Sequence, residues 1–563
     1  MMEKPVIKSI NYSEQGIRNL RKDLDATERD VILNQPTVYV INQDYKKKSS
    51  YRVYVGETND VIQRTEQHLQ KSTDKVNEMD DADMYIIGNL LFQKSMTLDI
   101  ENRMIEYLIG APDVFDIELL NARGNDQSLN YSGKDKTDEV FRLTIDELNK
   151  RDPKLFPKFS DVATRAIFKS SPFKSLNEEQ EKTKDLILST VAGQVTNKAT
   201  GQLILVEGAA GTGKTVLLSR LFYDLASREF AERAQLSQKL KVALVVNHKE
   251  QVKVYSNLVD KLKTNFGTPD FIVGTPTQLL NRVMNHGDEF DVVLIDEAHL
   301  VMTQPNKGAW THKLQNFFNA TEQISAIQSV AKTTIAIFDP NQILRADQSW
   351  DEEAVKKLRQ QATTRHELTT QMRMEIDAED KKWIDEFVNG ELREIPGSTN
   401  YEIKAFSNVV DMFDEIKSKN DKFGLSRMLA TYDWEWDKDG EWFVEVDGLS
   451  IPWNYTAVKE KKKITWAEDP ETIVEVGSTF TIQGFDLNYA GVILGPSIKY
   501  RDGHIVIDDD ENKSFWAAFN RKIGSAGTEK HLRDALNVLM TRAVRGLYIY
   551  AVDDELRSRL LGK

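Results

Sequence analysis

Between residues 203 and 338, short apolar runs recur, and each run ends in a polar or glycine-rich turn. Helix-like segments separate several of these runs, as expected where strands and helices alternate along the chain. Runs that are apolar on both faces are typical of strands buried inside a parallel sheet. The pattern therefore predicts an α/β fold with strands over residues 203–206, 241–246, 271–273, 291–295 and 334–338.

The first of these runs leads directly into a glycine-rich turn. Gly208, Gly211 and Gly213 are followed by Lys214 and Thr215, and a helix-like segment begins there. This strand, loop and helix have the spacing of a P-loop, in which backbone N–H groups and the helix N-terminus surround phosphates. We expect Lys214 to reach the β- and γ-phosphates and the Thr215 hydroxyl to ligate Mg²⁺. The chain should therefore bind a nucleoside triphosphate.

A second apolar run ends in two adjacent carboxylates, Asp296 and Glu297. A strand that delivers a carboxylate pair at its end suits an ATPase that has a P-loop earlier in the chain. We expect Asp296 to hold Mg²⁺ through water and Glu297 to orient the attacking water.

The N-terminal part shows a different pattern. Residues 1–36 are charged and partly helical in character, and two β-like runs follow at 37–41 and 51–56. Polar residues 46–50 separate these runs like a hairpin connection. A helix start follows Gly56, and Arg64 and His68 lie four residues apart on one helical face. A second amphipathic helix is expected over 98–109 and contains Glu101.

Composition shifts divide the chain into four parts. Residues 1–123 form the N-terminal domain with its lead-in, and the polar, turn-prone stretch 124–170 is interpreted as a linker. Residues 171–370 contain the P-loop and the carboxylate pair. Residues 371–563 form a second α/β domain that carries a tryptophan-rich insertion.

Overall composition excludes several classes of protein but does not by itself identify the function. The 563 residues exceed what one core supports, and no apolar run approaches the length of a membrane span. Cysteine is absent, which excludes disulfides and thiol nucleophiles. With no signal-peptide pattern at the start, a cytoplasmic location is expected and no membrane partner. The net charge of −14 means that any nucleic acid must bind in a local groove.

The N-terminal residues resemble the GIY-YIG nuclease family over about 90 residues. Tyr39 takes the place of the tyrosine of the first motif, where Thr37-Val38 replaces Gly-Ile, and Tyr54 and Gly56 match the second. Arg64 and His68 match the helix of the family, Glu101 its metal-binding glutamate, and Asn121 its later asparagine.

This resemblance implies roles for a metal-dependent endonuclease. Tyr39 would be the general base, assisted by Tyr54 or His68. Arg64 would stabilise negative charge and Glu101 would hold Mg²⁺ or Mn²⁺. The structural interpretation is that the tyrosines pack in a hairpin and that Arg64 and His68 form a solvated helix face.

The rest of the chain resembles superfamily 1 helicases over roughly 390 residues. The resemblance implies two RecA-like domains that clasp ATP. Gln180 would read adenine, Gln342 would sense the γ-phosphate, Arg373 would clamp it, and Arg542 would be the arginine finger. Gln483 and Gly484 match motif five. Taken singly, several of these segments could be plain turns or helix starts, and their order along the chain carries the assignment.

Finer details resemble the Schlafen-like helicases once grouped as family 2075, through residues 427–436, 451–454 and 479–495. In that resemblance the tryptophan-rich insertion belongs to the fold. We interpret it as a β-hairpin core in preference to a platform for stacking bases.

The resulting hypothesis is an ATP-driven motor on nucleic acid, DNA more than RNA, fused to a nuclease. By analogy, such a fusion would serve in defence against foreign DNA. The alternative is an ATP-gated sensor or scaffold with an inactive nuclease fold, and a signalling ATPase without nucleic acid is the third option.

Overall fold

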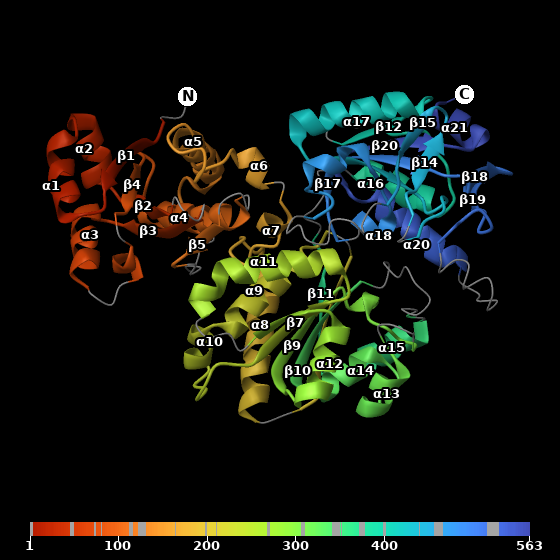
Figure 1. The fold of residues 1–563 in the computed structure, drawn as a ribbon, viewed down its shortest axis with the longest axis horizontal. Helices are drawn as coiled ribbons and strands as arrows, with labels where there is room; N and C mark the ends of the chain where they lie inside the picture. The colour runs from red at the N-terminus through yellow and green to blue at the C-terminus, as the bar shows by residue number, and fades with distance from the viewer. Residues whose placement is uncertain are drawn as a thin grey trace. The chain divides into compact units, whose positions relative to one another are not determined.

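The structure is a computed structural model of the 563-residue chain (Figure 1). It describes residues 4–45, 50–71, 75–79, 81–111, 116–121, 131–163, 165–197, 200–209, 211–266, 271–305, 310–339, 350, 352–370, 376, 378–397, 401–437, 440–454, 465–482, 484–514 and 528–562. The chain divides into two compact units. One contains 1–177, 219–233 and 255–270, and the other contains 178–218, 234–254 and 271–563.

The N-terminal unit is built on a five-stranded, mostly antiparallel sheet with the order β1-β4-β2-β3-β5. Only the last pair, β3 and β5, is parallel. The strands are β1 (Val6–Asn11), β2 (Thr37–Tyr45), β3 (Ser50–Thr58), β4 (Asp83–Gly88) and β5 (Asp116–Leu119). The expected hairpin at residues 37–56 is present as β2 and β3.

Helices cover this sheet and bury its apolar positions. Ile17, Leu20, Ile41, Met84 and Ile86 pack in one core. The helices of this part are α1 (Glu14–Asp23), α2 (Ala26–Leu33), α3 (Val61–Gln70), α4 (Lys94–Gly110), α5 (Thr137–Asn149), α6 (Phe159–Ala163), α7 (Ala166–Lys169) and α10 (Arg228–Arg233).

Two stretches at the edges of this unit differ from the sequence-based interpretation. The charged lead-in supplies β1, which pairs antiparallel with β4, as well as the expected helices. The stretch 124–170, interpreted as a linker, holds α5, α6 and α7, and Phe141 and Leu148 of α5 are buried. A few apolar residues at helical spacing suffice to bury one face of a helix such as α5. The polar residues between them made the stretch look like a linker in the sequence.

The second unit contains two parallel sheets, which confirms the predicted α/β class with parallel strands. The first has the order β11-β6-β10-β9-β7-β8. Its strands are β6 (Gln202–Gly208), β7 (Val242–Val246), β8 (Phe271–Gly274), β9 (Phe290–Asp296), β10 (Ala331–Phe338) and β11 (Thr364–Leu368). Around it in sequence lie α8 (Glu178–Thr196), α9 (Lys214–Ala226), α11 (Lys249–Phe266), α12 (Pro276–His286), η3 (Ala298–Leu300), α13 (His312–Phe318), α14 (Gln323–Ser329) and α15 (Glu352–Gln361).

The second parallel sheet has the order β12-β20-β17-β13-β16. Helix α17 packs on β13 and β17. The elements are α16 (Ala378–Val388), β12 (Glu402–Ala405), α17 (Val409–Phe423), β13 (Ser426–Ala430), η5 (Pro470–Val474), β16 (Val476–Gly477), α18 (Thr479–Ile482), β17 (Leu487–Leu494), α20 (Thr528–Met540), β20 (Ala543–Ala551) and α21 (Asp554–Leu560).

The tryptophan-rich insertion forms the hairpin of β14 (Phe443–Val446) and β15 (Leu449–Pro452). Trp453 is buried, and Trp434 and Trp442 pack against the same core. Trp453 thus serves packing, as the hairpin interpretation predicts, while Trp434 and Trp442 are half-buried at the edge of this core.

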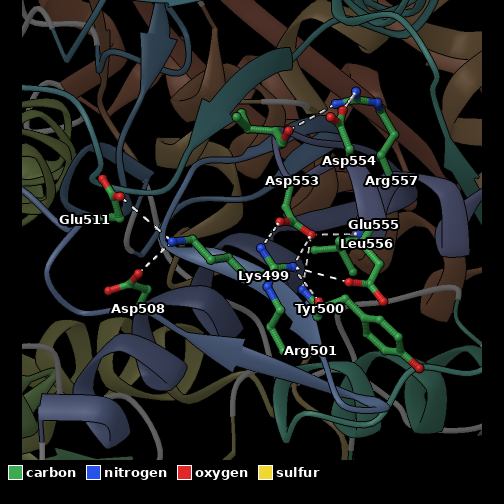
Figure 2. A network of polar contacts seen from close by, with 11 residues as sticks. Lys499, Tyr500, Arg501, Asp508, Glu511, Asp553, Asp554, Glu555, Leu556 and Arg557 are labelled. Atoms are coloured by element: carbon green, nitrogen blue, oxygen red, sulfur yellow. Dashed lines mark hydrogen bonds and ion pairs between the residues drawn. The ribbon is translucent and has the colours of Figure 1, made fainter.

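A further hairpin, β18 (Ile498–Arg501) with β19 (His504–Ile507), is joined to the last helix by ion pairs between side chains (Figure 2). Arg501 pairs with Asp553 at 2.8 Å, and the same carboxylate caps α21 through the backbone N–H of Leu556 at 2.9 Å. Lys499, two residues earlier on β18, pairs with Asp508 at 2.6 Å. The strands β18 and β19 form a sheet of their own, and these ion pairs hold that sheet to the residues around it.

No helix within the described residues combines the length and apolarity needed to cross a membrane.

Candidate functional site

The P-loop lies where the pattern predicts it, between β6 and α9. Gly211 and Gly213 have φ of +85° and +75°, a conformation that glycine adopts without strain. A Cβ at Gly208 would lie 2.7 Å from the Thr212 hydroxyl oxygen and 3.0 Å from the Leu368 carbonyl oxygen. Gly211 and Gly213 therefore suit the left-handed conformation of the loop, and position 208 leaves no room for a Cβ.

Lys214 is the first residue of α9, and its side chain folds back onto the loop. The ammonium donates to the carbonyls of Gly208 at 2.6 Å and Ala209 at 2.7 Å, and it pairs with Asp339 at 3.2 Å. The side chain is only 8% exposed. A buried ammonium needs such partners, and incoming phosphate oxygens would have to replace them. Thr215, the next residue, is half-buried beside it.

The carboxylate pair ends β9 in the same sheet. Asp296 and Glu297 are both buried. Glu297 adopts a left-handed backbone with φ of +48°, and its N–H donates to the Asp296 carboxylate at 3.0 Å. A residue in this conformation is held by its surroundings, here by the bond between its N–H and the preceding carboxylate.

Two residues that the sequence analysis did not single out complete this centre. His299 lies 3.5 Å from the Glu297 carboxylate, and its Nδ1 accepts from the backbone N–H of Asp339 at 3.3 Å. Burial lowers the pKa of His299, with Lys214 and Arg542 adding to the shift, so the imidazole is neutral. The available signal for Asp339 was its place directly after an apolar strand, where parallel sheets gather ligand-binding groups.

Gln180 is buried near the start of α8, and its amide donates to the carbonyls of Thr212 at 3.2 Å and Gly213 at 3.3 Å. The structure therefore brings Gln180 to the P-loop, although 32 residues of sequence separate it from Thr212.

Arg542 follows α20 and is 1% exposed, with Nε donating to the carbonyl of Val538 at 3.0 Å. Its charge contributes to the lowered pKa of His299, which places the guanidinium within electrostatic reach of the centre. Gly484 has φ of +84° and lies against Gln251. Gln342, Arg373 and Gln483 lie outside the described residues.

A second group of predicted residues meets in the N-terminal unit. Tyr39 comes from β2, Tyr54 from β3, and Arg64 and His68 from α3. The Tyr39 hydroxyl and His68 Nε2 are 3.0 Å apart, and the two tyrosine rings stack with centroids 6.2 Å apart. Although burial acts in the opposite direction, the two tyrosines raise the pKa of the Arg64 guanidinium, so Arg64 interacts with both rings. We call these four residues the tyrosine site.

The tyrosine site holds its phenol neutral. Tyr39 is 1% exposed, and burial raises its pKa far above the usual range, with the Tyr54 interaction adding to the rise and Arg64 opposing it. The charge of Glu101, from buried α4, also raises the pKa of Tyr39, so the carboxylate lies within electrostatic reach of the site. A hard carboxylate oxygen near phenol oxygens suits Mg²⁺, which keeps most of its waters.

Two further residues of the expected motif position the site. A Cβ on Gly56 would lie 2.4 Å from the ring of Tyr39, so only glycine fits under that ring. The Asn121 amide accepts from the backbone N–H of Val55 at 2.9 Å and donates to the Val55 carbonyl, which fixes β3.

The parallel sheets and the loop around Lys214 define a P-loop protein of mixed α/β class. Residues 201–553 match the family described as Schlafen group 3, DNA/RNA helicase domain. The match spans more than half of the chain, and the chain belongs to this family. The matched residues begin after Gln180 and do not include the tyrosine site.

An uncharacterized protein of Saccharomyces cerevisiae is 31% identical over 436 residues, which cover 71% of this chain and 93% of that protein. Among solved structures, Pif1 helicase from Candida albicans is 13% identical with a TM-score of 0.29, covering 69% of this chain and 96% of that one. The DUF1998 helicase MrfA bound to DNA is 10% identical with a TM-score of 0.29, covering 67% and 48%.

Proposed function

We propose that this chain is an ATP-driven translocase or helicase that acts on nucleic acid, DNA in preference to RNA. The carrying observation is the buried grouping of Lys214, the Asp296–Glu297 pair and His299 at the ends of β6 and β9, within a segment that belongs to a helicase-domain family. Arg542 adds a cation within electrostatic reach of that grouping.

In this proposal the residues divide the work of hydrolysis. Lys214 leaves the loop carbonyls and Asp339 to contact the β- and γ-phosphates. Glu297 orients the water that attacks the γ-phosphorus while the bond to the ADP oxygen breaks, and Arg542 stabilises the charge that develops. Bound Mg²⁺, held by Thr215 and Asp296, would neutralise phosphate charge. We further propose that Gln180, Gln342, Arg373 and Gly484 contact the nucleotide.

Steady-state ATP hydrolysis, measured with and without single-stranded DNA or RNA, tests the motor. Wild-type protein should hydrolyse ATP faster with DNA, and Glu297→Gln should bind a fluorescent ATP analogue but not hydrolyse ATP. Glu289→Gln is the matched control, because Glu289 lies just before the same strand. Hydrolysis that ignores both nucleic acids would instead support a signalling ATPase.

For the N-terminal unit we propose metal-dependent phosphodiester cleavage of the GIY-YIG type. The hydrogen bond between the Tyr39 hydroxyl and His68 Nε2 is the observation that supports it. Because the pKa of Tyr39 is raised, its oxygen can take a proton from water only if its own proton passes to His68.

The resulting hydroxide attacks phosphorus, the 3′-oxygen leaves and takes a proton from solvent, and Arg64 stabilises the added negative charge. Tyr54 stacks on Tyr39 and assists it. Glu101 would hold Mg²⁺ or Mn²⁺, which polarises the phosphate when bound.

The second candidate is an ATP-gated sensor or scaffold in which the nuclease fold only recognises nucleic acid. The observation in its favour is the 1% exposure of Tyr39, because a reacting group must reach its substrate.

Cleavage of circular and linear DNA with Mg²⁺ or Mn²⁺, with and without ATP, separates these candidates. Cutting should be lost in Glu101→Ala, altered in Lys214→Ala and retained in Glu66→Ala, an exposed carboxylate on α3. If no protein cuts under any condition while DNA still stimulates hydrolysis, the sensor is correct.

A further inference from the structure

The first turn of α8 contacts two neighbouring loops of the first parallel sheet. One is the P-loop, whose carbonyls accept from the buried Gln180 amide. The other follows β11, where Leu368 is the register partner of Gly208 and the chain continues to Thr369 and Thr370. A Cβ on Gly208 would lie 3.0 Å from the Leu368 carbonyl oxygen, so the P-loop and the end of β11 are adjacent.

Glu179 attaches this helical turn to the end of β11. One carboxylate oxygen accepts from the backbone N–H of Thr369 at 3.0 Å and from the hydroxyl of the same residue at 2.9 Å. The other oxygen accepts from the backbone N–H of Thr370 at 3.1 Å. Although burial raises the pKa of Glu179, these bonds outweigh it and lower the pKa below its usual range. The acceptor is therefore an ionised carboxylate, which strengthens each bond.

The favourable position of a carboxylate near a helix N-terminus does not account for these bonds. Glu178, Glu179 and Glu181 all lie in the first turn of α8, where negative charge favours the helix dipole. Glu178 is exposed, and Glu181 pairs with Lys184 of the same helix. Glu179 instead reaches a segment 190 residues further along the chain. It therefore sets where the first turn of α8 lies in the fold.

The neighbouring residue, Gln180, carries the group that this position controls. Its amide nitrogen donates to the carbonyls of Thr212 at 3.2 Å and Gly213 at 3.3 Å. A side-chain amide has two N–H donors and one acceptor oxygen. While both donors are directed at the loop, a base that meets this amide meets its acceptor oxygen. That oxygen favours a base with an amino group, such as adenine, over a base with an oxo group at the same position.

The rest of α8 is attached to the sheet independently of Glu179. Near the far end of the helix, the Gln194 side-chain oxygen accepts from the Thr333 hydroxyl of β10 at 2.8 Å. Ile187 and Val191 are buried between the two ends. The first turn of a helix has N–H groups without intrahelical acceptors and is the turn that frays. Loss of the Glu179 carboxylate should therefore loosen the first turn and leave the helix in place.

We propose that Glu179 is a positioning residue that sets the base selectivity of the nucleotide site by holding Gln180 against the P-loop. The proposal rests on the proposed function, in which Gln180 contacts the nucleotide. Glu179 itself touches neither base nor phosphate. The phosphates are bound by the P-loop and Lys214, so their binding should not depend on Glu179.

Competition binding to the full chain tests this division between base and phosphates. ATP, inosine triphosphate and inorganic tripolyphosphate each displace a fluorescent ATP analogue in the presence of Mg²⁺. Inosine triphosphate has an oxo group in place of the adenine amino group, and the wild type should prefer ATP to it by about tenfold or more. Glu179→Ala should lose most of this preference, as Gln180→Ala should, with unchanged affinity for tripolyphosphate. Glu178→Ala, at the exposed neighbour, is the matched control and should keep the preference.

A conservative variant separates positioning from misfolding. Glu179→Gln keeps the shape of the side chain and one acceptor oxygen for Thr369, but it turns an N–H group toward the N–H of Thr370. Its preference for ATP should lie between those of the wild type and Glu179→Ala, with circular dichroism near wild type for all three proteins.

Three results would overturn the proposal. They are a full ATP preference in Glu179→Ala, a loss of tripolyphosphate affinity in that variant equal to its loss of ATP affinity, and a wild type that binds ATP and inosine triphosphate equally. A wild type that binds neither tripolyphosphate nor ATP would instead refute the proposed nucleotide site. The two failures are thus distinguishable.

Discussion

Lys214 and Tyr39 are both buried polar groups, but different partners satisfy them. Lys214 lies in the ATP centre, by which we mean Lys214, Asp296, Glu297, His299 and Asp339, and Tyr39 lies in the tyrosine site. Lys214 bonds to the carbonyls of its own loop and to Asp339, all of which a nucleotide would displace. Tyr39 bonds to His68, and the charge of Arg64 opposes the rise in its pKa; both residues belong to the proposed chemistry itself. The ATP centre is thus arranged around an exchange of partners, and the tyrosine site is assembled before any ligand arrives.

This difference has an energetic consequence. A ligand at the ATP centre must compensate for contacts that it breaks, so binding energy can drive a conformational change there. At the tyrosine site, the pre-formed hydrogen bonds cost no reorganisation at the moment of reaction. We therefore expect mutations to affect binding and turnover at the first site and turnover alone at the second.

The largest expected effect is that of Arg542→Ala. Removing a cation that stabilises the transferring phosphoryl group should lower kcat for ATP hydrolysis about 10³-fold or more. Steady-state hydrolysis at saturating DNA measures this. Arg545→Ala, which removes a cation stacked over Phe423 at 5.3 Å, should retain turnover. Equal activity of both variants would remove Arg542 from the centre.

The next effect concerns the tyrosine site. His68→Ala removes the proton acceptor for Tyr39 and should slow DNA cleavage about 10²- to 10³-fold with KM nearly unchanged. ATP hydrolysis should stay at the wild-type rate. Gln67→Ala, at the exposed neighbour on α3, is the control. A rise in KM without loss of kcat would show that His68 contributes to substrate binding and not to the chemical step.

Stability should depend on pH through a buried carboxyl on the helix that carries Glu101. Burial raises the pKa of Glu106 to about 7, although Lys174 and Arg103 oppose the shift. Because the folded pKa exceeds the unfolded value, its stabilising contribution is present below about pH 4.5 and is lost as pH rises through 7. Glu106→Gln should thus stabilise α4 at pH 8 by up to about 3 kcal/mol.

Hydrogen exchange of α4, corrected for intrinsic rates, measures this change at pH 8 and at pH 4.5, where the variant and the wild type should converge. Glu139→Gln, an exposed position on α5, should have no effect at either pH. Destabilisation of the variant at pH 8 would mean that ionised Glu106 has favourable partners.

The smallest expected effect tests the partner exchange at Lys214. Asp339→Asn keeps the shape of the side chain but removes the charge that competes with phosphate for the ammonium. Affinity for ATP should rise about threefold to tenfold, corresponding to roughly 1 kcal/mol. Equilibrium binding of a fluorescent analogue measures it, with Asp288→Asn as a surface control. Weaker binding would show that Asp339 holds Lys214 in its productive position.

Much of the ATP centre was predictable because its parts are local. A strand, two positive-φ glycines, a lysine and a helix occupy residues 202–226 without a break, and hydrogen bonding within that stretch dictates its shape. The roles of His299 and Asp339 could not be predicted, because their contact joins segments that follow two different strands, 40 residues apart. The family resemblance, and not local pattern, suggested the four members of the tyrosine site.

The sequence by itself determined the α/β class, the P-loop and the hairpin of β2 and β3, because periodicity and turn chemistry act over a few residues. Only the tertiary structure decided that β1 and α5 belong to a core and that Lys261 caps α4. That cap joins residues about 150 apart. Such contacts depend on chain topology, because desolvation and hydrogen bonding between distant segments reward a particular packing that no local pattern encodes.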